Sequence, residues 1–147
     1  MNTKADTLIT PEQEDKLINT WKEIMNSKYV DPSNPPTAQE MIKSYLKGRG
    51  ETQKHYKPGT YDFSNPETMY KEYWEQYVSF LALHHKLINT KGTERREKAR
   101  KSVAKKLAKY LRRTPTATDL KSAFPSLTEL DDEICQVIDK DLASLVI

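Results

Sequence analysis

The amino-acid sequence predicts an all-α protein: a small bundle of about five or six helices with one aromatic loop that contains proline and glycine. Three observations support this fold class. Apolar residues recur at intervals of three and four along most of the chain. Helix-capping patterns precede several of these stretches. Proline and glycine gather in a few short segments that separate them.

The size and composition of the chain indicate one domain with a thin core. The 147 residues are 36% apolar and 31% charged, and the mean hydropathy is −0.83. These values allow a folded but very hydrophilic protein. We therefore expect a single helical domain over residues 1–147, in which residues 1–65 and 66–147 are possible sub-units.

The first helix is predicted from Thr10 to about Ser27. Thr10 is placed to cap it, Pro11 suits the first helical position, and Gln13 can close a capping box. The apolar residues that follow share one face: Leu17, Ile18, Trp21, Ile24 and Met25.

A second, short helix is predicted after the proline-rich residues 31–36. Thr37 and Glu40 form another capping box, and Gly48 suits the left-handed position that ends a helix. Its apolar face comprises Met41, Ile42, Tyr45 and Leu46.

Residues 49–65 are predicted to form a loop or at most a small hairpin, with a type II turn at Pro58-Gly59. Tyr56 and Tyr61 flank this turn, together with His55, Phe63 and nearby lysines. These rings could pin the loop onto the core. Alternatively, Tyr56 and Tyr61 could stack on unpaired bases or contact a protein partner.

The second half of the chain predicts four more helical segments. A central core helix runs from Pro66 to about Thr90 and is stopped by Gly92. The next covers residues 93–112, with Ala99, Val103, Leu107, Tyr110 and Leu111 on one face.

Residues 114–116 break the chain before a short helix around Leu120 and Phe124. Ser126 and Glu129 form a capping box for the last helix. Its apolar seam comprises Leu127, Leu130, Ile134, Val137, Ile138, Leu142 and Leu145. We expect the apolar end at Ile147 to be buried or to pair in a homodimer.

Charge is strongly segregated along the chain. Residues 91–113 carry 11 Lys and Arg against 2 Asp and Glu, a net charge of +9, whereas residues 119–141 carry 2 against 7, a net charge of −5. The remaining residues are nearly neutral. Such asymmetry indicates a charged partner or electrostatic docking within the molecule.

The basic segment supplies the candidate binding residues. On a helical wheel the cations Lys98, Lys101, Lys105, Lys109 and Arg112 form one narrow stripe, opposite the apolar face. Like charges four residues apart destabilise a helix by about 0.2–0.5 kcal/mol per pair. The stripe, with the adjacent Arg113, is therefore predicted to contact nucleic-acid phosphates. It could also face solvent, bind an acidic protein or membrane surface, or be covered by the acidic last helix.

Residues 107–120, Leu-Ala-Lys-Tyr-Leu-Arg-Arg-Thr-Pro-Thr-Ala-Thr-Asp-Leu, resemble the start of the helix-turn-helix-like third region of bacterial sigma factors. The resemblance implies DNA-associated function. The chain departs from that pattern further on, since the turn at Phe124-Pro125-Ser126 lacks glycine. The helix that would approach DNA also begins with acidic residues, Glu129, Asp131, Asp132 and Glu133, which repel phosphate. We therefore expect backbone contacts without base reading.

No catalytic or metal-binding motif is recognisable. His84 and His85 have no carboxylate or cysteine at helical spacing, and Cys135 lies in an acidic helix that disfavours its thiolate. Glycine-rich phosphate loops are missing too. The sequence predicts a non-enzymatic protein without a cofactor.

The apolar stretch at residues 78–83 is too short to span a membrane or to serve in a signal peptide. With its single cysteine, the chain is expected to be cytoplasmic. Two functions remain open: a nucleic-acid-binding or transcription-associated accessory protein, and a protein-protein adaptor or inhibitor that uses separate basic and acidic faces.

Overall fold

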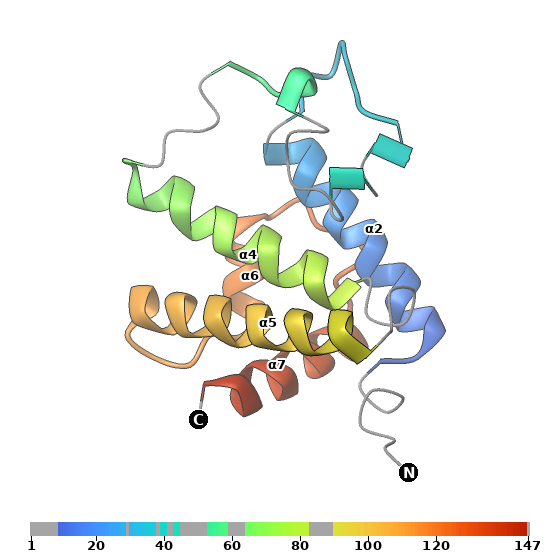
Figure 1. Ribbon diagram of the computed structural model, residues 1–147. Coiled ribbons are helices and arrows are strands. Elements are labelled where there is room, and N and C mark those ends of the chain that lie inside the picture. The colour runs from blue at the N-terminus through green and yellow to red at the C-terminus, as the bar shows by residue number, and fades with distance from the viewer. Residues whose placement is uncertain are drawn as a thin grey trace.

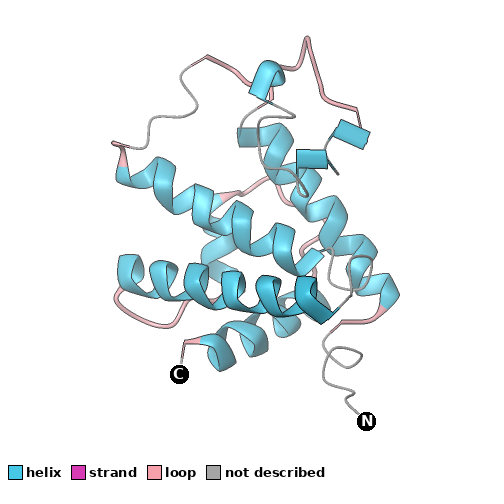
Figure 2. Ribbon diagram, viewed as in Figure 1, coloured by secondary structure: helices cyan, strands magenta, loops and turns pink. Residues whose placement is uncertain are grey.

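A computed structural model describes residues 9–28, 30–37, 39–40, 43–44, 53–58, 64–82 and 90–146. Helices and loops make up this part of the chain, and no strand is present in it (Figure 2). Its helices are α2 (Pro11–Lys28), α4 (Pro66–Ala82), α5 (Thr90–Leu111), α6 (Ala117–Ala123) and α7 (Asp132–Leu145), with a 3-10 turn, η2, at Gln53–His55. The predicted all-α class is confirmed.

The helices pack around an antiparallel pair formed by α4 and α5, which lie side by side across the molecule (Figure 1). Helix α2 packs along α4. Helix α7 packs against α5, α6 and α2. None of the described helices is long and apolar enough to cross a membrane.

All five helices contribute to one core cluster of buried side chains. Trp21 of α2, Trp74 of α4, Leu107 of α5, Leu120 of α6 and Ile138 of α7 are at most 1% exposed. Helix α4 is central, as the sequence predicts. It packs on α2 and α5, and α7 reaches it through a hydrogen bond from the Tyr77 hydroxyl to Asp141, 2.7 Å long.

Two predicted capping boxes are present. The Gln13 side chain accepts from the Thr10 backbone N–H at 2.8 Å, and the Thr10 hydroxyl accepts from the Gln13 N–H at 3.1 Å. The equivalent distances for Thr37 and Glu40 are 3.0 and 3.1 Å. Of the short helix expected between Thr37 and Gly48, residues 39–40 and 43–44 are described and are helical. The rest of that helix, Gly59 of the expected turn and the end at Ile147 lie outside the described residues.

The expected stop at Gly92 is wrong, because Gly92 lies inside the first turn of α5, which begins at Thr90. Backbone N–H groups in a first turn have no partner within the helix, and glycine is tolerated there.

The expected cap of the last helix is also wrong. Asp131, and not Ser126, caps α7 by accepting from the Ile134 N–H at 3.0 Å. The segment predicted to form its first turn is held elsewhere, because the Thr128 backbone and hydroxyl donate to Glu23 of α2 at 3.1 and 2.8 Å. Asp131 also forms an ion pair with Lys16 of α2.

Candidate nucleic-acid interface

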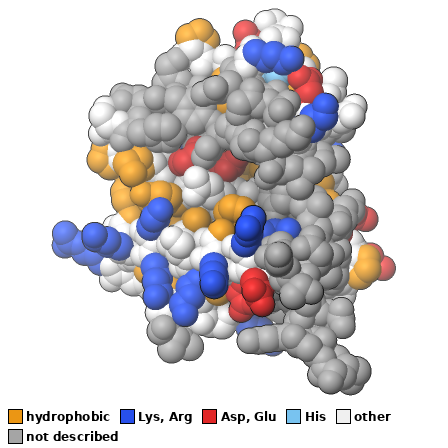
Figure 3. Space-filling model, in the orientation of Figure 1, with side chains coloured by type: hydrophobic (Ala, Val, Ile, Leu, Met, Phe, Trp, Pro, Cys, Tyr) orange, Lys and Arg blue, Asp and Glu red, His pale blue; other side chains and the backbone are white. Residues whose placement is uncertain are grey.

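One side of α5 is built for packing. Val103, Ala104 and Leu107 are at most 4% exposed and face the core. The opposite side carries the stripe that the sequence predicts, and each of its five cations is exposed. We call these residues the basic face: Lys98, Lys101, Lys105, Lys109 and Arg112. Figure 3 shows Lys and Arg side chains gathered over α5 on the side turned to the viewer.

None of the five cations of the basic face forms an ion pair with another described residue. From Lys98 to Arg112 the basic face extends about 21 Å, at roughly 1.5 Å per helical residue. Within it, Lys101, Lys105 and Lys109 recur every fourth residue, so their backbone positions are about 6 Å apart along the helix axis. This gives a linear array of positive charge.

The acidic segment, in contrast, is largely engaged inside the molecule. Asp119 pairs with Arg113, Asp131 with Lys16, and Asp141 with Arg100. Asp139 accepts from the Ala117 backbone N–H at 2.8 Å. Glu133 accepts from the Gln13 side chain at 2.7 Å. Five of the seven acidic residues in 119–141 are therefore engaged in contacts within the molecule, and none of the seven pairs with the basic face.

A buried ion pair joins α5 to α7. The Arg100 guanidinium donates to both oxygens of Asp141, at 3.0 and 3.2 Å, and the two residues are 6% and 5% exposed. The Tyr77 hydroxyl donates to the same carboxylate. Burial, followed by the negative charge of Asp141, raises the pKa of Tyr77 well above its ordinary value. Tyr77 therefore remains protonated as a donor.

The end of α5 is fixed by a second ion pair. Arg112 has a φ of 60°, the left-handed conformation that commonly ends a helix. The next residue, Arg113, donates to both oxygens of Asp119 at 2.9 and 2.5 Å. Its hydrogen bonds lower the pKa of the Asp119 carboxyl below the usual range. Arg113, which the sequence predicts as a phosphate contact, thus also joins α5 to α6.

The exposure of Tyr110 differs from the prediction made from the sequence. The periodicity places this residue on the buried face of its helix, but in the structure it is 46% exposed. Its ring stacks on Tyr70 of α4, with 4.3 Å between centroids and 15° between planes. One turn earlier, the Lys106 ammonium lies 5.5 Å from the centroid of the Tyr73 ring. No sequence signal separates such a surface stack from a core position, because both occur at the same helical spacing.

Of the two tyrosines predicted to stack on bases, Tyr56 is half-buried and packs against the core cluster. Its backbone forms an isolated antiparallel bridge with Val30. Both features are those of a residue that anchors a loop. Tyr61 lies outside the described residues.

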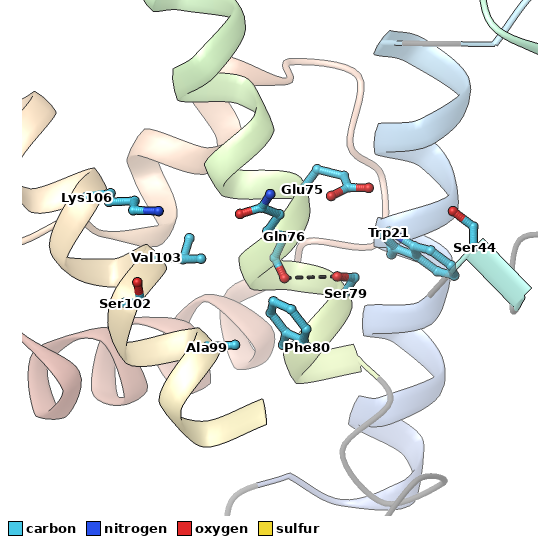
Figure 4. Close-up of a pocket in the computed structure, with 10 residues that line it drawn as sticks. All are labelled: Trp21, Ser44, Glu75, Gln76, Ser79, Phe80, Ala99, Ser102, Val103 and Lys106. Atoms are coloured by element: carbon cyan, nitrogen blue, oxygen red, sulfur yellow. Dashed lines mark hydrogen bonds between the residues drawn. The ribbon is translucent and has the colours of Figure 1, made fainter. Parts of the chain in front are cut away.

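A pocket of about 350 Å³ opens beside the basic face, between α2, α4 and α5 (Figure 4). Its lining is mixed, with aromatic rings from Trp21 and Phe80, a buried carboxyl group from Glu75 and the Lys106 ammonium. The other lining residues are Ser44, Gln76, Ser79, Ala99, Ser102 and Val103. The Ser79 hydroxyl donates to the Gln76 carbonyl at 2.9 Å.

The described side chains form no metal site of the usual acidic, histidine or cysteine type. No group of three or more His, Cys, Asp and Glu residues there could hold a metal ion. Burial raises the pKa of the Cys135 thiol, an effect opposite to the activation of a nucleophile. His84 and His85 lie outside the described residues.

Comparison of the chain with models of protein families, with curated proteins and with solved structures finds no match.

Proposed function

We propose that this protein is a non-enzymatic, nucleic-acid-binding accessory protein that contacts phosphates through the basic face of α5. The observation that carries the proposal is the exposure of five aligned cations, Lys98, Lys101, Lys105, Lys109 and Arg112, without ion pairs to the described residues. Aligned like charges disfavour an isolated helix. Polyanion binding offsets that repulsion and releases the counterions condensed on the nucleic acid.

The binding mode is contact with the sugar-phosphate backbone. Lysines on a convex helix reach phosphate oxygens but carry no information about base sequence. The resemblance of residues 107–120 to a sigma-factor region supports a role close to transcription. Its helix-turn-helix reading, however, would present α7 to DNA, and the exposed Asp132 and Glu133 at the start of α7 would repel phosphate.

The contrast between the two charged segments favours nucleic acid over a two-faced protein adaptor. An adaptor requires both faces to be available to partners. The acidic segment places Asp119, Asp131, Asp139 and Asp141 in internal contacts. The five exposed cations of the basic face therefore outnumber the acidic side chains of residues 119–141 that form no hydrogen bond or ion pair within the described part of the molecule.

Charge reversal tests the proposal. The variant Lys101→Glu, Lys105→Glu, Lys109→Glu is compared with a control of equal net charge, Lys22→Glu, Lys121→Glu, Lys140→Glu, whose sites lie on other helices. Retention of each protein is measured on DNA and RNA columns at low salt. We expect the α5 variant to lose retention and the control to keep most of it.

Equal retention of the two variants would overturn the proposal. A discrete protein captured from native lysate by the wild-type chain and lost from the α5 variant, with no retention on nucleic acid, would support the adaptor function instead.

A further inference from the structure

We infer that Tyr110, backed by Tyr70, is a stacking platform for an unpaired base, so that the protein binds single-stranded nucleic acid along α5 in preference to duplex. This inference rests on the proposed function, because it requires that the basic face binds phosphates. It adds a second kind of contact, one made with a base.

The geometry of Tyr110 suits a platform. It is the only large apolar side chain exposed in the described part of the molecule. Tyr70 covers one side of its ring in a nearly parallel stack, with 4.3 Å between centroids. With 46% of the residue exposed, the ring offers aromatic surface to solvent. Every base has an aromatic face, so such a surface accepts bases without regard to sequence.

The platform is also held rigidly. Tyr70 packs edge-on to Trp74 at 6.5 Å and 78°, and Trp74 packs edge-on to Tyr77 at 6.0 Å and 83°. Trp74 and Tyr77 are fully buried. A row of aromatic rings thus connects the surface ring to the core. A ring fixed before binding loses little side-chain entropy when a base stacks on it.

Positive charge adjoins the platform. Lys106 lies one turn before Tyr110 on the same side of α5, and Lys109, at the edge of the basic face, lies about 100° around the helix from Tyr110. Arg113, which pairs with Asp119, follows Tyr110 by three residues at the end of α5. A strand whose phosphates contact Lys109, at the edge of the basic face, and Lys106 can therefore bring a base over Tyr110. In a duplex the bases are already stacked and paired, and the platform finds no free base.

The test compares Tyr110→Ala with Tyr110→Phe, which keeps the aromatic face. Binding is measured by fluorescence anisotropy at low salt with oligodeoxythymidylate, oligouridylate and a mixed-sequence DNA duplex. We expect Tyr110→Ala to weaken single-strand binding roughly 5- to 100-fold and to leave duplex binding within about twofold. Tyr110→Phe should bind all three probes like the wild type. Comparison of binding to the DNA and RNA single strands shows whether the protein prefers deoxyribose or ribose.

A second measurement does not depend on how the variants fold. A single strand that contains 2-aminopurine is titrated with wild-type protein, and stacking is expected to quench its fluorescence. No quenching, or equal losses of single-strand and duplex binding in Tyr110→Ala, would overturn the inference while the proposed function stands. Absence of wild-type binding to every probe would overturn both.

Discussion

Arg100 of α5 and Asp141 of α7 form a buried, bidentate ion pair in which both guanidinium-carboxylate hydrogen bonds are 3.0–3.2 Å long. The most basic and the most acidic segments of the chain therefore meet, but they meet in the interior. Arg100 is on the core side of α5, whereas the five cations of the basic face are on the other side and exposed. Internal charge pairing and the proposed phosphate binding thus use different residues of one helix.

Loss of the Asp141 charge should destabilise the protein strongly. Asp141→Asn leaves the buried guanidinium of Arg100 without its counter-charge, and the expected loss is about 3–5 kcal/mol in the free energy of unfolding. Tyr77→Phe removes a single hydrogen bond to the same carboxylate and should lose about 1.5–3 kcal/mol. Urea denaturation at neutral pH measures both changes. A loss for Asp141→Asn smaller than that for Tyr77→Phe would contradict the assignment of the ion pair as the principal contact.

The variant Arg112→Gly should affect stability and nucleic-acid binding in different ways. Arg112 has a φ of 60°, where a side chain with a Cβ is strained and glycine is not. Glycine should therefore raise the free energy of unfolding by up to about 1 kcal/mol, or be neutral where its greater unfolded-state entropy offsets the gain. The same change removes one cation and should weaken nucleic-acid binding. A variant that is no less stable yet binds as tightly as the wild type would show that Arg112 makes no phosphate contact.

The helices could be predicted from sequence because their signals are local. The Thr10 and Thr37 capping boxes and the apolar periodicity of α2 and α4 depend on residues three or four apart. The start of α7 could not be predicted in this way, because Ser126 and Asp131 both have side-chain oxygens that can cap a helix. A tertiary contact decides between them: Thr128 donates to Glu23, about one hundred residues away in sequence.

Glu40 should contribute to acid sensitivity. The Thr37 backbone N–H and then His55 hold the pKa of Glu40 to about 2, against an ordinary value of 4.5. Because the folded-state pKa is the lower one, ionised Glu40 stabilises the folded protein above about pH 4.5. That contribution is lost as the pH falls from 4.5 toward 2.

Melting temperatures of the wild type and Glu40→Gln, measured from pH 7 to pH 2, test this directly. The wild type should melt at a higher temperature above pH 4.5, and the difference should shrink toward zero near pH 2. Asp119 and Asp131, whose pKa values are also lowered, titrate in both proteins and cancel in the difference. A difference that is constant with pH would contradict the assignment.

The candidate site was predictable in part. The helical wheel places Lys98, Lys101 and Lys105 on one stripe, and the structure leaves them exposed. Periodicity could not show that Arg113 pairs with Asp119, since that contact crosses a helix junction. Nor could it show that Tyr110 is exposed on Tyr70, because the ring it stacks on belongs to another helix.

The salt dependence of binding tests most directly the claim that the basic face contacts phosphates. Anisotropy titrations of a DNA duplex at several salt concentrations should give a log-log slope of about −4.5 for five phosphate contacts, at roughly −0.9 per contact. In the variant Lys101→Gln, Lys105→Gln, Lys109→Gln the slope should weaken by about 2.7. A slope near zero for the wild type, or one that the three substitutions leave unchanged, would contradict this account of α5.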